Sequence, residues 1–414
     1  MKVMHINTFS EGGAAKACLR LHSGLLKMGV DSKVLVLYST PLQADIPEVY
    51  DYKKLALNSF LKKLSFRIKE SFRWRYLQYL LKGKPKEFDI FSTLCLHHNI
   101  THLKIFKEAD IINLHWVANF LNYDELSLSN KKIVWTLHDM NAFTGGCHYT
   151  SGCKQFLNHC YECPQLEGTK HKHIVKSIFH KKQKFYSKNN IVFITPSQWL
   201  CETAKKSHLL AEKNIFHIPY GIDTKVFKPF PKIAARNAFG LPIDKKNIIF
   251  VSDSLNNRRK GLHLLMQVLE GISDPDILLC AIGKGKESVN EKIIYLGKIL
   301  DENKMALAYS SANLFVIPSL EDNLPNTVLE AMACGIPVVG FNTGGIPEMV
   351  INGENGYIVE KANVDEMKNN IFQLVNNKDL LVKFASKNRE RIVLLYSLEK
   401  QAKEYLHLYQ KILS

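Results

Sequence analysis

Two acidic side chains eight residues apart carry the strongest chemical signal in the sequence. Asp322 and Glu330 stand in the segment PSLEDNLPNTVLEAMACG at 318–335. The pattern predicts a strand, then a loop with Asp322, then a helix that begins near Asn326 and carries Glu330. Backbone N–H groups at a helix start bind anions, and a carboxylate accepts hydrogen bonds from hydroxyl groups. This combination suits recognition of a diphosphate and a ribose.

Glu330 also has a purely structural interpretation. Thr327 and Glu330 have the spacing of a capping box, in which the glutamate only satisfies backbone N–H groups at the helix start. The spacing by itself leaves both interpretations open.

A second chemical cluster consists of four cysteines within seventeen residues: Cys147, Cys153, Cys160 and Cys163. Four thiolates, two of them in a C-x2-C pair, suit a tetrahedral Zn²⁺ site that pins an irregular loop. An iron–sulfur cluster and reduced thiols without metal are the alternatives. His148 is an alternative ligand.

Short apolar runs alternate with longer helical patterns along the chain, which is typical of parallel α/β sheets. The runs cover residues 2–7, 33–38, 110–116, 132–138, 191–197, 247–254, 276–283, 292–297, 314–319 and 337–342. Their rhythm predicts an α/β fold of two doubly wound, Rossmann-like domains. The first domain is expected at 1–217, a proline-rich linker at 218–232 and the second domain at 233–394. Sites in such sheets lie beyond the carboxyl ends of the strands.

The chain carries 55 Lys and Arg against 39 Asp and Glu, and this net charge of +16 points to anionic partners. The run 53–86 holds eleven basic residues and one acid, Glu70, and a second run at 170–188 has seven lysines and no acid. The first run also has an apolar helical stripe, which consists of Phe60, Leu64, Ile68, Phe72, Tyr76 and Leu80. Such a helix can lie on an anionic membrane. A helix packed on its own domain with a solvated basic face is an equal alternative.

The sequence also bears on the compartment. No stretch approaches the ~18 apolar residues of a membrane span, and the N-terminal residues do not have the pattern of a signal peptide. We therefore expect a cytoplasmic protein with reduced cysteines. If the basic helix binds lipid, the protein is peripheral on the inner face of the cell membrane.

The segment around Asp322 and Glu330 resembles the family 4 glycosyltransferases of the GT-B fold, in the variant with the loop sequence EDNLPNT. The resemblance extends over most of the chain through EGGAAKACLRLHSGL (11–25), WTLHD (135–139), ITPSQWL (194–200), IPYGID (218–223), TGGIPE (343–348) and NGENGYIV (352–359). It implies two Rossmann-like domains that face each other across a cleft. It also implies a last helix, at about 395–414, that packs back on the first domain.

The resemblance implies roles for the acids and for the loop between them. Glu330 is expected to contact the ribose of a sugar-nucleotide donor, and Asp322, with Glu321 beside it, to contact the donor sugar. Backbone amides of the following loop are expected to approach the sugar and phosphate. This loop consists of Asn323, Leu324, Pro325 and Asn326.

Further cationic and glycine positions follow from the same resemblance. Lys260, just before a helix, is expected to hold the donor diphosphate together with Arg258 or Arg259. Solvated loop charges are the alternative for Lys260. Gly12 and Gly13 form a tight turn after the first strand, where backbone and ligand can approach closely.

His138 ends a strand and matches the family's histidine in the cleft, where it is expected to contact the donor sugar or the acceptor. A structural role is the alternative for a histidine at this place. His115 and Trp116, at the end of the preceding strand, are weaker candidates on the acceptor side.

The implied activity is that of a retaining hexosyltransferase. It would move a sugar from a nucleoside diphosphate sugar to a saccharide or lipid-linked saccharide in bacterial surface polysaccharide synthesis. The family needs no cofactor for its chemistry, so a Zn²⁺ at the cysteines would be structural. The alternatives are a nucleotide-sugar epimerase or hydrolase on the same fold, a silent sugar-nucleotide sensor, and a basic nucleic-acid-binding protein. Because no nucleic-acid-binding motif is present, we expect no nucleic acid partner.

Overall fold

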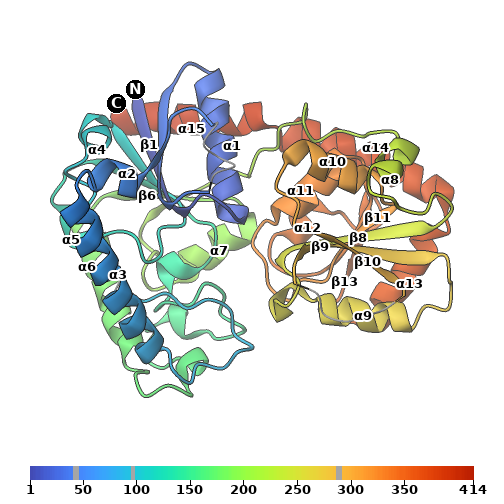
Figure 1. Cartoon of the computed structure of the whole chain (residues 1–414), viewed down its shortest axis with the longest axis horizontal. Coiled ribbons are helices and arrows are strands. Elements are labelled where there is room, and N and C mark those ends of the chain that lie inside the picture. The colour runs from blue at the N-terminus through green and yellow to red at the C-terminus, as the bar shows by residue number, and fades with distance from the viewer. Residues whose placement is uncertain (41–45, 95–97, 286–290) are drawn as a thin grey trace. The chain divides into compact units, whose positions relative to one another are not determined.

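The computed structural model describes residues 1–40, 46–94, 98–285 and 291–414. Its internal contacts divide these residues into two compact units, each built around one parallel β-sheet (Figure 1). The first unit comprises Met1–Pro219 and Gln401–Ser414, and the second unit comprises Tyr220–Lys400.

The described part of the first unit holds a seven-stranded parallel sheet in the order β3-β2-β1-β4-β5-β6-β7. Its strands are β1 (Lys2–Phe9), β2 (Asp31–Tyr38), β3 (Val49–Asp51), β4 (Ile111–Leu114), β5 (Lys132–Thr136), β6 (Ile191–Thr195) and β7 (Asn214–His217). Both faces are covered, because Met4 and Ile6 belong to one hydrophobic cluster and Val3 to another. The carboxyl ends of β1, β4 and β5 therefore meet at the middle of one sheet edge.

The helices of the first unit range from single turns to twenty-one residues. They are α1 (Gly13–Lys27), α2 (Tyr52–Ala56), α3 (Phe60–Leu80), α4 (Lys104–Glu108), α5 (Tyr123–Ser127), α6 (Ile174–Lys188), α7 (Gln198–Lys206) and α15 (Leu398–Leu413). Between β5 and α6 the chain forms only the short 3-10 turns η2 (Asn141–Phe143), η3 (Gln155–Leu157) and η4 (Pro164–Leu166). This long irregular segment contains the four clustered cysteines.

The described residues of the second unit form a six-stranded parallel sheet in the order β10-β9-β8-β11-β12-β13. The strands are β8 (Lys246–Ser254), β9 (Ile277–Lys284), β10 (Ile293–Gly297), β11 (Leu314–Ile317), β12 (Val338–Phe341) and β13 (Gly356–Val359). The helices are α8 (Lys232–Ala238), α9 (Leu262–Glu270), α10 (Glu302–Ser310), α11 (Asn326–Ala333), α12 (Ile346–Met349), α13 (Val364–Val375) and α14 (Lys378–Leu395), and the 3-10 turn η5 (Arg258–Lys260) precedes α9. The order places β8 beside β11, so the turns that follow these two strands are neighbours.

The structure confirms the predicted α/β fold with two doubly wound sheets. Each of the ten predicted apolar runs contains a strand, and the described chain adds β3, β7 and β13. β3 is only three residues long and half-buried, and β7 is largely exposed. Neither therefore has the continuous apolar run that marks a strand buried on both faces.

The C-terminal helix α15 packs against the sheet of the first unit. Tyr405 and Tyr409 are fully buried in the same cluster as Val3. Their hydroxyl groups reach polar side chains of the sheet: Asn113 Nδ2 donates to the Tyr409 hydroxyl at 2.7 Å, and the hydroxyls of Thr136 and Tyr405 are 3.0 Å apart. Buried polar groups thus anchor the last helix to the middle of the sheet.

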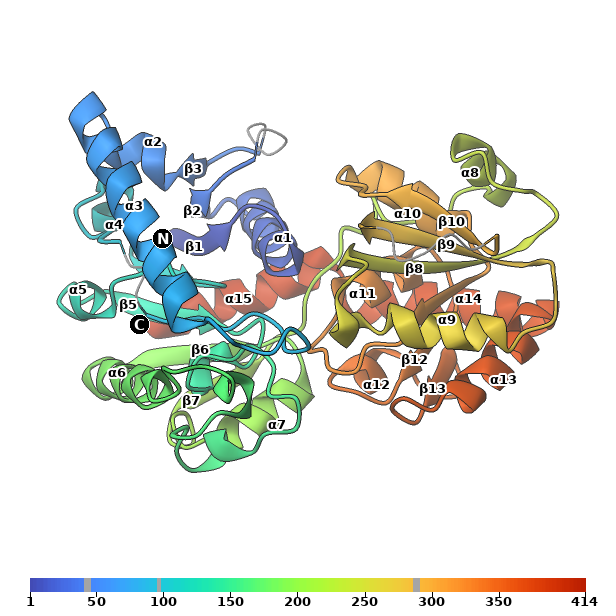
Figure 2. The same cartoon turned by 60° about the horizontal axis from the view of Figure 1, so that its bottom comes forward.

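The basic run 53–86 folds mainly into α3, which runs along the outside of the first unit (Figures 1 and 2). Leu77 and Leu80 are buried, and Phe66 packs against the core. Most of the predicted apolar stripe does not pack, because Phe60 is 77% exposed and Phe72 is 65% exposed. The alternative in which the whole stripe packs on its own domain is therefore wrong.

The single acid of this run, Glu70, faces inward. The Tyr38 hydroxyl donates to Glu70 Oε2 at 3.1 Å, and His98 Nε2 lies 3.4 Å from Oε1. Burial opposes ionisation of Glu70, but His98, Tyr38 and Arg73 together hold its pKa below the ordinary value. The outward surface of α3 therefore carries the basic residues without the acid. Among the described helices, none is long and apolar enough to span a membrane.

We predict that Tyr409→Phe destabilises the first unit by about 1–3 kcal/mol, because it leaves the buried Asn113 amide without its acceptor. Urea unfolding followed by tryptophan fluorescence measures this unit selectively, since Trp74, Trp116, Trp135 and Trp199 are the four tryptophans of the chain. Tyr50→Phe is the matched control, because that hydroxyl bonds Glu48 at the surface and its loss should change stability by less than about 0.5 kcal/mol. Equal unfolding midpoints for the two variants would contradict the prediction.

Candidate active site

The loop after β11 and the start of α11 form the centre of the candidate site in the second unit. α11 begins at Asn326 after Pro325, which has no side-chain capping bond. Asp322, Asn323 and Asn326 are each at most 9% exposed. The loop predicted to contact a donor, with Leu324 also buried in it, therefore lies at the carboxyl edge of the sheet.

Asp322 of this loop forms an ion pair with Lys260 of the turn η5. Lys260 Nζ lies 2.6 Å from Asp322 Oδ2, and Arg259 Nη1 lies 3.9 Å from Oδ1. Burial opposes ionisation of Asp322, but the charges of Lys260 and Arg259 outweigh it and hold the pKa of the carboxyl below its ordinary value. At neutral pH the carboxylate can therefore only accept hydrogen bonds. Two cations around one carboxylate leave an excess of positive charge for an anionic group.

Arg259 is the arginine that the structure brings to this acid. Its Nη1 also donates to the backbone carbonyl of Glu321 at 2.6 Å. Arg258, at the start of the same 3-10 turn, is exposed. The side chain of Glu321 is half-buried, whereas Asp322 is the neighbour that pairs with Lys260.

Two glycines let backbone segments close in on this loop. Gly261 has φ +77°, and a Cβ there would lie 1.8 Å from the carbonyl oxygen of Pro318. Gly344 has φ +55°, and a Cβ there would lie 1.6 Å from the carbonyl oxygen of Asp322. Any side chain at either position would push the loop away. The cationic turn and the acidic loop are therefore held together by backbone contact as well as by charge.

Glu330 is buried in the second turn of α11, with 1% of its surface exposed. The Tyr309 hydroxyl from α10 donates to Glu330 Oε2 at 3.0 Å. Because the helix starts at Asn326, Thr327 is inside the helix and is not the capping residue. The capping-box interpretation of Glu330 is therefore wrong. The carboxylate is held in place by a neighbouring helix instead.

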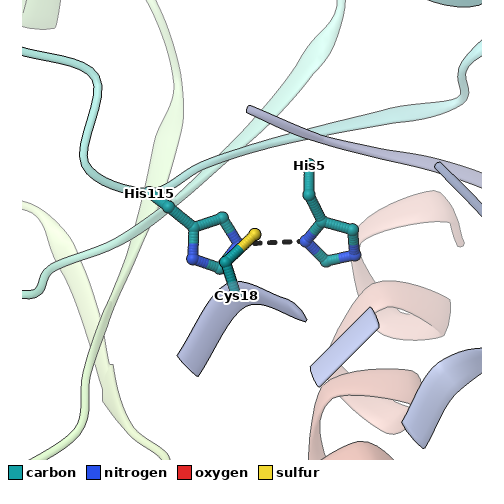
Figure 3. Close-up of side chains that lie close together, drawn as sticks. All are labelled: His5, Cys18 and His115. Carbon is teal, nitrogen blue, oxygen red and sulfur yellow. Dashed lines mark hydrogen bonds between the residues drawn. The ribbon is translucent and has the colours of Figure 1, made fainter. Parts of the chain in front are cut away.

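In the first unit, His138 is the end of a chain of three histidines that crosses the sheet. His5 Nδ1 lies 3.0 Å from His115 Nε2, and His115 Nδ1 lies 3.0 Å from His138 Nε2 (the first of these bonds is drawn in Figure 3). Burial lowers the pKa of His138 to about 4 and lowers those of His5 and His115 well below the ordinary value. All three rings are therefore neutral at pH 7. Because a neutral ring has one N–H, the tautomer of each ring depends on that of its neighbour.

Cys18 of α1 approaches the inner end of this chain. Its sulfur and ligand atoms of His5 and His115 all lie within 4.8 Å of one another (Figure 3). The two rings already bond each other, and burial raises the pKa of the Cys18 thiol. The group therefore has the character of a neutral, buried hydrogen-bonded cluster.

His138 lines a pocket at the carboxyl edge, together with His115, Trp116, Asp139 and His148. A buried network fixes the far wall of this pocket. Asp139 Oδ2 lies 2.6 Å from His148 Nδ1 and accepts from Trp116 Nε1 at 2.8 Å. The other ring nitrogen of His148 lies 2.7 Å from a serine hydroxyl, Ser92 Oγ. Both nitrogens of His148 are thus engaged, which removes it as an alternative metal ligand.

Gly12 and Gly13 lie at the same edge, directly after β1. Gly12 is the N-cap of α1 with φ +98°, a conformation that favours glycine. The first unit therefore brings the glycine turn and His138 to one sheet edge, with β4 between their strands.

Sequence reasoning missed several residues of these sites. His5 lies inside an apolar strand, and Tyr309 lies in a helix without a motif, so neither has a local signal. Asp139 and His148 are only nine residues apart, but Trp116 joins them from the loop after β4. The TGGIPE motif contains Gly344, and the sequence does not reveal that this glycine has a positive φ.

Comparison with known proteins gives the following matches. The sequence model of the family "Glycosyl transferases group 1" matches residues 234–391. An uncharacterized glycosyltransferase of Haemophilus influenzae is 34% identical over 143 residues, which cover 31% of this chain and 40% of that protein. The Escherichia coli K12 protein WcaC, named for glycosyl transfer in colanic acid biosynthesis, is 23% identical over the whole of both chains.

Solved structures show the same fold over the full length. Sucrose-phosphate synthase from Thermosynechococcus elongatus has a TM-score of 0.67 at 18% identity and covers 100% of this chain and 99% of its own. HepE from Anabaena, in complex with UDP-glucose, has a TM-score of 0.67 at 15% identity, with 99% of this chain and 100% of its own covered. The second unit therefore matches the group 1 glycosyltransferases in sequence, and the chain as a whole has the GT-B fold of these solved structures.

Proposed function

We propose that this protein is a retaining hexosyltransferase of glycosyltransferase family 4. It moves a sugar from a nucleoside diphosphate sugar to a hydroxyl group of a saccharide or lipid-linked saccharide in bacterial surface polysaccharide synthesis. The observation that carries the proposal is the group of Arg259, Lys260 and Asp322, whose net positive charge lies beside the loop before α11. The UDP-glucose bound by HepE and the naming of WcaC support the donor and pathway classes.

The cationic turn acts on the leaving group. The bond between the anomeric carbon and the donor phosphate oxygen breaks, and negative charge develops on the diphosphate. Lys260 has three N–H donors, so it can keep its bond to Asp322 and also donate to a phosphate oxygen. Stabilising charge at the leaving group lowers the barrier without a covalent intermediate.

The two acids bind the donor at either end. Asp322 stays ionised beside Lys260 and accepts a hydrogen bond from a sugar hydroxyl. Glu330 accepts a hydrogen bond from Tyr309, which orients the carboxylate, and the carboxylate accepts hydrogen bonds from ribose hydroxyls. The loop from Asn323 to Asn326 supplies backbone amides for sugar and phosphate oxygens.

The acceptor hydroxyl attacks the anomeric carbon from the face that the diphosphate leaves, and its proton passes to the leaving phosphate oxygen. His138, neutral at pH 7, is a hydrogen-bonding group for the sugar or acceptor, and its orientation is set by His115. Neither step needs a metal ion or an organic cofactor.

We predict that Glu330→Gln lowers kcat/KM for the donor about 10–100-fold, because hydrogen bonds to a charged acceptor contribute about 1.5–3 kcal/mol. A calorimetric screen of UDP-, GDP- and ADP-sugars first identifies the donor, and the variant is then compared with wild type on it. Glu354→Gln, an exposed glutamate of the same unit, is the matched control and should retain full activity. A folded Glu330→Gln protein with normal turnover would refute the site assignment.

We further predict that the product has the same anomeric configuration as the donor, as measured by the H1–H2 coupling in NMR spectra. Incubation of the donor without acceptor separates the alternatives. An epimerase or hydrolase consumes the donor alone, whereas a transferase needs the acceptor for rapid turnover. An inverted product would contradict the retaining mechanism.

We propose in addition that α3 docks the first unit on an anionic lipid surface. Its exposed apolar residues stand beside exposed cations, and the acid of the helix points inward. The exposed apolar residues are Phe60, Leu61, Leu64, Ile68, Phe72 and Tyr76, and the exposed cations are Lys62, Lys63, Arg67, Lys69 and Arg75. Such a surface combines apolar insertion with attraction to anionic headgroups. A peripheral position on the inner face of the membrane would bring the enzyme to a lipid-linked acceptor.

Sedimentation with vesicles tests this docking surface. We predict binding to phosphatidylglycerol-containing vesicles and much weaker binding to pure phosphatidylcholine. The double variant Leu61→Ser/Phe72→Ser should bind anionic vesicles at least about tenfold more weakly, because ~0.8 kcal/mol is lost per buried CH₂. Leu394→Ser, equally exposed on α14, should bind like wild type. Equal binding of both variants would contradict the role of α3.

A further inference from the structure

Four cysteines that are spread over seventeen residues line one small pocket in the first unit. Cys147 and Cys160 are buried, and Cys153 and Cys163 are half-buried. All four belong to the pocket wall, which Phe91 completes with apolar surface. Because the segment between β5 and α6 has only 3-10 turns, its own backbone bonds do little to hold these cysteines together.

A buried lysine adds positive charge next to the cluster. Lys182 of α6 is 1% exposed, and its ammonium donates to the backbone carbonyls of Asn141 and Thr144. The basic run 170–188 therefore places one of its seven lysines in the interior of the first unit. Thr144 also lines the cysteine pocket, so this ammonium lies near the cluster and would offset part of the negative charge of a tetrathiolate.

We propose that Cys147, Cys153, Cys160 and Cys163 bind one structural Zn²⁺. Tetrahedral coordination at about 2.3 Å requires sulfur atoms about 3.8 Å apart. Among these fully described residues, no three sulfur atoms lie within 4.8 Å of one another, so the thiolates must move inward when the metal binds. Zinc would then close the pocket and link three parts of an irregular segment.

The metal would have a defined structural consequence. The segment that contains the cysteines also supplies Asp139 and His148 to the pocket beside His138. Pinning this segment would fix that pocket wall, whereas the loop around Asp322 lies in the other unit. The proposal concerns the first unit alone and does not depend on the proposed reaction.

Metal analysis of the purified full-length protein tests the proposal. We expect about one equivalent of zinc per chain, and loss of it in Cys160→Ser and Cys163→Ser. Cys201→Ser, a buried cysteine of α7 outside the pocket, should keep its zinc. Replacement of zinc by Co²⁺ should give the visible absorption of a tetrahedral tetrathiolate site.

A second measurement covers the case in which the serine variants do not fold. Removing zinc from wild-type protein with a chelator should lower the thermal midpoint followed by tryptophan fluorescence, and added Zn²⁺ should restore it. Protein without zinc whose four thiols react freely would overturn the proposal. Disulfides among the four cysteines, or iron in place of zinc, would overturn it as well.

Discussion

A buried carboxylate stays ionised only if cations lie close to it. In the second unit, this requirement of Asp322 explains why a cationic turn packs against the loop before α11. Lys260 and Arg259 both come from the turn after β8, which is the strand next to β11 in the sheet. The turn can reach the acid only because Gly261 has no side chain to meet the carbonyl of Pro318. The charge cluster therefore depends on strand order and on a glycine, as well as on the charged residues.

In the first unit, the polar groups at the sheet edge are mostly neutral and bond one another. His5 lies on β1, and His115 and His138 lie just beyond the ends of β4 and β5. Hydrogen bonds link the three rings in series. Asp139, the only acid among the described residues in the wall of that pocket, is balanced by His148 and Trp116. The two units thus offer different chemistry at their sheet edges. The second has an excess of fixed positive charge suited to a diphosphate, and the first has uncharged hydrogen-bonding groups suited to sugar hydroxyls.

The high net charge of the chain divides into parts with different physical roles. Lys260 and Arg259 are partly buried and paired, so salt screens them weakly. Lys182 is buried and satisfies backbone carbonyls in an irregular segment. The cations of α3 are exposed beside apolar side chains. Of these three groups, only the cations of α3 have the solvent access that a large anionic surface requires.

By itself, the sequence determined the α/β class, ten of the described strands and the loop that carries Asp322, because apolar periodicity and helix boundaries are local properties. It also identified Glu330 and the cysteines by residue type and spacing, and Lys260 through the resemblance to a glycosyltransferase family. Only the tertiary structure decided between Arg258 and Arg259, excluded the capping box of Glu330 and turned the stripe of α3 outward. Each of these depends on atoms that are distant in sequence: Asp322 for Arg259, Tyr309 for Glu330, and the core that Phe66 packs against for α3. The histidine chain was hidden for the same reason, since no local pattern encodes a contact across three strands.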